Sequence, residues 1–139
     1  MSVTADNIAA QVMKMRDFLL IGAGALLGAN ARYWLTNYFV QRLGPAFPYG
    51  TLFINVTGSF LLGFVIVLVA NRFVADPGYR LLIGTGFLGA YTTFSTFSYD
   101  TIVLLERGDI LPAILNVSAS VAASLVAAYL GIALARLVG

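Results

Sequence analysis

Residues 84–98 read GTGFLGAYTTFSTFS, an apolar stretch in which three glycines precede a run of hydroxyl side chains. The glycines are Gly84, Gly86 and Gly89, and glycine disfavours a helix interior. Hydroxyl side chains fill five of the seven positions from Thr92 to Ser98. This pattern predicts a membrane-spanning helix that breaks near mid-membrane, where freed carbonyls can bind a cation and freed N–H groups an anion. The alternative is close helix packing on glycine, with the hydroxyls bonded back to their own helix.

Two phenylalanines interrupt the hydroxyl run. Phe94 and Phe97 are three residues apart and therefore share a helical face. The edge of a phenyl ring carries weak positive potential, so two edges can line a dehydrated anion without trapping it. Ser95 and Thr96 would add hydroxyl donors beside the rings. In the competing interpretation, the rings simply contact lipid or another helix.

The composition around this stretch indicates a membrane protein. Of 139 residues, 60% are hydrophobic and 10% are charged, whereas about a quarter of an ordinary soluble domain is charged. The eight Lys and Arg are spread singly among six Asp and Glu, so no basic patch indicates a nucleic acid partner. The absence of Cys and His excludes disulfides, thiolate nucleophiles, zinc clusters and imidazole acid–base chemistry. We therefore expect no enzymatic activity.

Four intervals have the apolar length of about 20 residues that a helix needs to cross a bilayer core. Short polar or proline-containing loops separate them, and Asp109 with Pro112 marks the start of the last. Short loops make neighbouring helices antiparallel, and an even number of spans puts both termini on one side. The predicted fold class is an all-α membrane protein of four transmembrane helices, the third of them broken. The spans are predicted at about 18–40, 51–71, 81–105 and 110–135.

The predicted domain organisation is a polar N-terminal lead over residues 1–17 and a single transmembrane domain over residues 18–139. Lys14 and Arg16 before an apolar segment also imitate a signal peptide with a small-residue cleavage site. The apolar pattern resumes for eight residues after Arg32, however, as it does in a spanning helix. We therefore expect this segment to be the first span.

Polar side chains form stripes along the second and fourth spans. Such a stripe, facing the bundle interior, is what a hydrophilic track requires, although small residues at this spacing also serve close helix packing. Asn55 is the hardest to explain by packing, since a buried amide needs several partners. The stripes are Thr51, Asn55, Ser59 and Gly63 in the second span, and Asn116, Ser120 and Ser124 in the fourth.

Charged residues give the orientation and one further candidate. Five basic residues on the side of the termini against two on the other side favour termini inside, but the bias is small enough to allow both orientations. Arg32, within the first span, is a candidate vestibule charge that attracts anions, or an anchor reaching the headgroups. Asp100 either pairs with an arginine or lies at the interface.

Three segments together resemble the Fluc (CrcB) family of fluoride channels. They are GALLGANARYWL at Gly24–Leu35, YGTLFINVTGSFLLG at Tyr49–Gly63 and GTGFLGAYTTFSTFS at Gly84–Ser98. The resemblance covers all four predicted spans, and the third segment is the most specific.

The resemblance implies a passive channel that exports fluoride across the plasma (inner) membrane of a bacterial or other microbial cell. It further implies an antiparallel, dual-topology homodimer in the lipid bilayer, with two separate pores and a structural sodium ion at the dimer interface. On the family pattern, the backbone carbonyls of Gly89 and Thr92 hold this sodium. The fluoride pore residues implied are Asn55, Phe94, Ser95, Thr96, Phe97, Ser120 and Ser124.

Two other functions fit four apolar spans. A proton-coupled small multidrug exporter needs a titratable carboxylate deep in a helix, but the first span has no acid and Asp100 lies toward the end of the third. A membrane assembly subunit without transport activity explains the glycines, but not three polar tracks.

Overall fold

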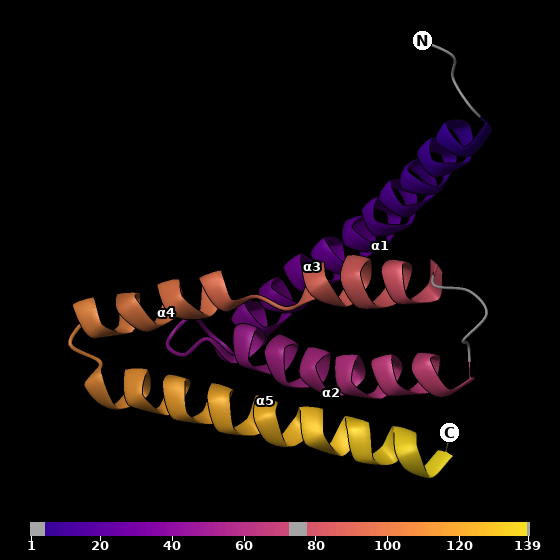
Figure 1. Cartoon of the computed structure of the whole chain (residues 1–139). Coiled ribbons are helices and arrows are strands. Elements are labelled where there is room, and N and C mark those ends of the chain that lie inside the picture. The colour runs from indigo at the N-terminus through magenta and orange to yellow at the C-terminus, as the bar shows by residue number, and fades with distance from the viewer. Residues whose placement is uncertain (1–4, 73–77, 139) are drawn as a thin grey trace.

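The computed structural model describes residues 5–72 and 78–138, and within these ranges every regular element is a helix (Figure 1). The prediction of an all-α chain is confirmed. The order is α1 (Ala5–Leu43), α2 (Tyr49–Arg72), η1 (Arg80–Leu88), α3 (Gly89–Tyr91), α4 (Phe94–Glu106) and α5 (Ile110–Val138). The start of α1 and the end of α5 lie toward the same end of the molecule. The first four residues of the predicted lead, residues 73–77 of the second loop and the last residue lie outside the described residues.

The polar lead and the first predicted span form one helix. α1 has 39 residues, so its axis is about 58 Å long at about 1.5 Å per residue. It ends at a turn in which Gly44 has a φ of 79°, a left-handed conformation that glycine adopts without strain. The prolines Pro45 and Pro48 follow, and α2 begins immediately after them. The connection is shorter than the predicted gap between residues 40 and 51, because α1 continues to Leu43 and α2 already begins at Tyr49.

Residues 84–98 contain an irregular section. η1 is a π-helix, and the three-residue α3 follows it directly. Thr92 and Thr93 then leave the helical conformation, with φ and ψ of −75° and 156° and of −153° and 114°. α4 resumes at Phe94. The chain is thus extended at the two threonines that follow the glycines.

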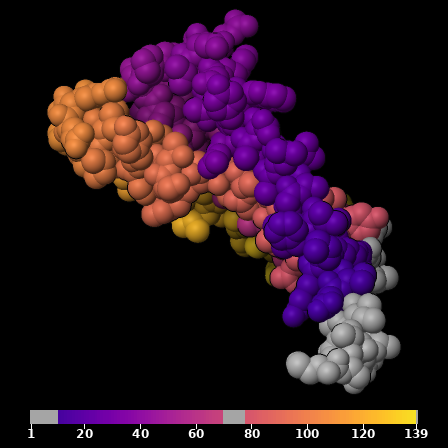
Figure 2. Space-filling view, turned by 90° about the horizontal axis from the view of Figure 1, so that it is seen from above, coloured from indigo at the N-terminus to yellow at the C-terminus, as the bar shows by residue number. Residues whose placement is uncertain are grey.

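Glycines bring the helices close together at two contacts. A Cβ atom on Gly24 or Gly28 of α1 would collide with backbone of Leu82 and Phe87 in η1. A Cβ atom on Gly131 of α5 would likewise collide with backbone carbonyl of α2. Among the three glycines of residues 84–89, the packing interpretation is correct for Gly86, whose added Cβ would lie 2.7 Å from the Ile21 carbonyl oxygen, whereas Gly89 has free space. Figure 2 shows the result on the outer face, where α1 lies across the salmon-coloured residues that follow residue 80.

The buried core of one chain is small. Ile54, Leu88 and Tyr91 form one cluster of it, and the ring of Phe87 stacks on Tyr91 at 5.8 Å between centroids. Phe97 and Leu104 of α4 are buried as well. Many large apolar side chains point outward instead, including Leu125 of α5, which is 68% exposed. α2 over Tyr49–Val69 and α5 over Ile110–Val138 are long and apolar enough to cross a membrane. An outward apolar surface on such helices suits lipid or a second chain better than water.

Candidate functional site

The centre of the site is the contact between Asn55 of α2 and the extended Thr93. The Asn55 side-chain Nδ2 donates to the Thr93 carbonyl at 3.0 Å, and the Thr93 N–H donates to Asn55 Oδ1 at 2.8 Å. One amide side chain therefore satisfies both backbone groups of a residue that has left the helix. This explains why an amide side chain lies in an apolar helix. The N–H and C=O of extended backbone between apolar helices need hydrogen-bond partners from another element.

Thr93 also begins α4. Its Oγ1 accepts from the Thr96 N–H at 3.1 Å, as an N-capping threonine does, and donates to Thr96 Oγ1 at 3.0 Å. Ser95 Oγ lies 3.2 Å from Thr93 Oγ1. Two of the predicted site residues, Ser95 and Thr96, are therefore gathered around Thr93 in the cap of α4.

The extended residues divert N–H groups from helical hydrogen bonds. In an uninterrupted helix the Gly89 carbonyl accepts from the N–H of Thr93, and the Thr92 carbonyl from that of Thr96. Here the Thr93 N–H donates to Asn55 and the Thr96 N–H donates to Thr93 Oγ1. The two carbonyls predicted to bind a metal are thus the ones released from these partners. Gly89 is exposed, and an added Cβ would meet no atom of its own chain closer than 3.8 Å.

A cavity of about 310 Å³ lies against Asn55 and Thr93. We name it the polar cavity after the amide and hydroxyl side chains in its lining, although most of its accessible wall is apolar. Residues from α2, α4 and α5 line it together with the two extended threonines. Five of the seven predicted pore residues meet here, whereas Ser95 and Thr96 are not among its lining residues. The lining residues are Asn55, Ser59, Thr92, Thr93, Phe94, Phe97, Ser120, Val121, Ser124 and Leu125.

The two serines from α5 differ in their hydrogen bonds. Ser120 Oγ lies 3.4 Å from Asn116 Oδ1, and Asn116 in turn donates to Thr101 Oγ1 at 2.9 Å. Ser124 Oγ is buried and, among the described residues, has no hydrogen-bond partner. A buried hydroxyl without a partner costs free energy of about 1–3 kcal/mol, so Ser124 offers a donor to whatever enters the cavity.

The two phenylalanines face the cavity from different depths. Phe97 is 8% exposed, whereas Phe94 is 78% exposed. Their ring centroids are 5.4 Å apart and their planes are tilted by 46°. The shared face expected from their spacing is therefore present, but Phe94 stands at the open edge of the cavity in a single chain.

The remaining candidates lie elsewhere. Arg32 is half-buried on α1 and is not a lining residue of the polar cavity. Asp100 of α4 accepts a hydrogen bond from Thr51 Oγ1 of α2 at 2.7 Å. Sequence reasoning missed this contact, and it also missed the role of Thr93. A threonine just before a resumed helix is the N-cap signal that identifies Thr93.

A small all-helical chain with two long apolar helices, α2 and α5, and a cavity lined by amide and hydroxyl side chains fits the class of membrane channels and transporters. Residues 19–132 match the family described as "CrcB-like protein, Camphor Resistance (CrcB)", and the chain belongs to this family.

Curated relatives agree with this assignment. A protein of Rhizobium meliloti (strain 1021), named "Fluoride-specific ion channel FluC", is 48% identical over 122 residues, which are 88% of this chain and 98% of the relative. A relative of the same name in Methylococcus capsulatus is 52% identical over 116 residues, which are 84% of this chain and 51% of that protein. One in Koribacter versatilis is 45% identical over 97 residues, 70% of this chain and 77% of the relative. The family resemblance of the three sequence segments is confirmed, and these relatives are named as channels, not enzymes.

Proposed function

We propose that this protein is a passive, fluoride-selective channel that exports fluoride across the plasma (inner) membrane of a microbial cell and so lowers cytoplasmic fluoride. The observation that carries the proposal is the polar cavity, where Asn55, the unpartnered hydroxyl of Ser124 and the ring of Phe97 meet. The names of the relatives support fluoride as the ion.

The cavity supplies neutral donors for a small, strongly hydrated anion. Asn55 has two N–H donors, and Thr93 uses one of them, so the other is available. Ser124 adds its O–H, and Phe97 adds the weakly positive edge of its ring. None of these groups carries a full positive charge, so fluoride is held weakly at several points and can leave quickly, as conduction requires.

The membrane potential supplies the driving force. A potential negative inside moves an anion outward with about 2.3 kcal/mol per 100 mV. Export therefore requires neither ATP nor a coupling ion.

The assembly that fits this function is an antiparallel, dual-topology homodimer in the bilayer, with two separate pores. In one chain Phe94 and Gly89 are exposed, and the polar cavity opens at Phe94. A second copy packed on this face would close the cavity. Its close approach would explain why residue 89 is a glycine although its own chain leaves free space around it. The small difference in basic residues between the two sides allows either orientation.

A structural sodium ion fits the helix interruption. Gly89 and Thr92 would hold it through the two carbonyls that have lost their helical N–H partners. In an antiparallel dimer two copies of each carbonyl would meet, and hard cations prefer oxygen ligands. If so, the melting temperature of the purified dimer should be higher in sodium than in N-methylglucamine. Equal melting temperatures in both media would contradict the sodium site.

Three further residues complete the proposed path. Ser95 and Thr96 would act at its rim, where their hydroxyls contact Thr93, a lining residue. Arg32, half-buried in α1, would attract anions into the vestibule.

Reconstituted protein tests the function directly. Liposomes loaded with potassium fluoride should release fluoride when valinomycin lets potassium leave, and liposomes loaded with potassium chloride should release far less chloride. A fluoride flux that requires a proton gradient would favour a proton-coupled exporter, and no flux at all would favour an assembly subunit. Either result would overturn the channel.

A further inference from the structure

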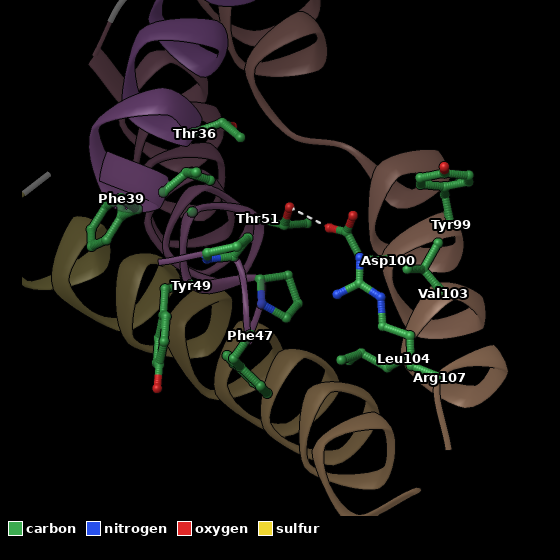
Figure 3. A pocket seen from close by; sticks show the side chains of 14 residues that line it. Thr36, Phe39, Phe47, Tyr49, Thr51, Tyr99, Asp100, Val103, Leu104 and Arg107 are labelled. Atoms are coloured by element: carbon green, nitrogen blue, oxygen red, sulfur yellow. Dashed lines mark hydrogen bonds between the residues drawn. The ribbon is translucent and has the colours of Figure 1, made fainter. Parts of the chain in front are cut away.

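A second cavity, of about 250 Å³, lies where α1, the turn after it, α2 and α4 meet (Figure 3). Most of its lining is aromatic, aliphatic or proline. Two lining residues are charged: Asp100 of α4 and Arg107, which follows the last residue of α4. Thr51 of α2, which is 3% exposed, lies beside Asp100.

This second cavity lies along the same pair of helices, α2 and α4, as the polar cavity. Thr51 is one turn before Asn55 on α2, and Asp100 is about one turn after Phe97 on α4. Asn55 and Phe97 line the polar cavity, and Thr51 and Asp100 line the second one. An anion leaving the polar cavity toward this end of the chain would therefore meet Asp100.

Asp100 alone would oppose such an anion. The hydrogen bond from Thr51 Oγ1, 2.7 Å long, fixes Asp100 Oδ2 at the α2 side of the cavity. At a separation of about 4 Å and an effective dielectric constant of about 20, repulsion between two unit negative charges would slow passage roughly a thousandfold. A path through this cavity therefore needs a positive charge to offset the carboxylate.

Arg107 provides that charge from the same helix face. It stands seven residues, or about two turns, after Asp100, at the C-cap of α4. Figure 3 shows its side chain extending from the end of α4 toward Asp100, and both residues line the cavity, although these two described residues form no ion pair. A basic residue at a helix C-terminus also interacts with the helix dipole, but that role needs no orientation toward the cavity.

We propose that Arg107 compensates the charge of Asp100 and thereby makes this cavity the mouth through which a small hydrated anion enters or leaves the pore. The compensation acts in both directions. Without Arg107 the carboxylate repels the anion, and without Asp100 the guanidinium would hold it too long, whereas conduction needs weak binding. The inference rests on the proposed fluoride channel.

The test is fluoride efflux from liposomes of uncharged lipid at low ionic strength. Arg107→Gln should lower the flux at least tenfold relative to the unaltered protein. Arg42→Gln is the matched control, because Arg42 ends α1, does not line the cavity and lies over the Tyr38 ring at 5.6 Å. We expect this control to retain the full flux. The loss in Arg107→Gln should shrink in concentrated salt of an impermeant anion, since screening shortens to about 3 Å at about 1 M.

The double variant Arg107→Gln/Asp100→Asn separates charge compensation from structural support. It should pass more fluoride than Arg107→Gln alone, because the repelling carboxylate is gone. Arg107→Lys, which keeps the charge, should also pass more than Arg107→Gln. Full flux in Arg107→Gln, or a loss that Asp100→Asn does not relieve, would overturn the proposal while the unaltered channel still conducts. An unaltered protein that passes no fluoride would instead refute the proposed function itself.

Discussion

Replacing Asn55 by aspartate exchanges a side-chain NH₂ group for an oxygen and so turns a neutral amide in the polar cavity into a carboxylate. The introduced carboxylate would keep an oxygen to accept from the Thr93 N–H, now 2.8 Å from Asn55 Oδ1, but would lose the donor to the Thr93 carbonyl, now 3.0 Å away. An unpaired carbonyl costs about 1–3 kcal/mol of folding free energy. A carboxylate about 4 Å from a passing anion would add about 4 kcal/mol to its barrier at an effective dielectric constant of about 20, or roughly a thousandfold in rate.

Fluoride efflux from liposomes in neutral buffer, together with the melting temperature of the same protein, measures both effects. Asn55→Asp should remain folded, with a lower melting temperature and almost no fluoride flux. Asn30→Asp is the matched control, since Asn30 is exposed on α1 and its Nδ2 donates to the Leu26 carbonyl of the same helix at 2.7 Å. The control should conduct normally. Normal flux through folded Asn55→Asp would refute the assignment of Asn55 to the anion path.

Four further substitutions test the phenyl rings, the α2–α5 contact and the proposed sodium site. Phe94→Ile and Phe97→Ile keep apolar bulk but remove the ring edge, so each should lower fluoride flux roughly tenfold without loss of folded protein. Unchanged flux in both variants would show that the rings only pack against lipid or another helix. Gly131→Ala should lower the free energy of unfolding by about 1–3 kcal/mol, because the introduced Cβ would collide with a carbonyl of α2. Gly22→Ala is the control and should leave the free energy of unfolding unchanged, since Gly22 has free space around it. Equal melting temperatures of the two variants would contradict the tight α2–α5 contact. Gly89→Val should abolish the stabilisation by sodium, and a retained sodium effect would place the ion elsewhere.

Local signals in the sequence predicted most helix boundaries. Pro48 stands directly before α2, and Asp109 and Pro112 stand at the start of α5. Proline fixes φ and lacks an N–H wherever it stands, and aspartate is favoured just before a helix. Gly50, expected in the turn, lies inside α2 instead. The start of α1 was not predicted. Polar residues before Phe18 end a hydrophobic span, but they do not end a helix.

The composition of the site was predicted better than its hydrogen bonds. The four-residue spacing of the polar stripes predicted that Asn55 and Ser124 face the bundle interior, and both line the polar cavity. It could not show that Ser95 and Thr96 bond to Thr93, because that choice depends on where the chain becomes extended. Nor does spacing reveal a contact such as Thr51 to Asp100, which joins residues 49 positions apart and depends on how α2 and α4 pack.

The reversal potential of the reconstituted protein in a planar bilayer tests the central claim most directly. With fluoride at different concentrations on the two sides and chloride and pH equal, a fluoride-selective channel should reverse at a voltage that shifts by about 59 mV for each tenfold fluoride ratio. A chloride or a proton gradient imposed alone should leave the reversal potential near zero. A potential that follows chloride or pH, or a bilayer without current, would contradict a passive fluoride channel built around this cavity.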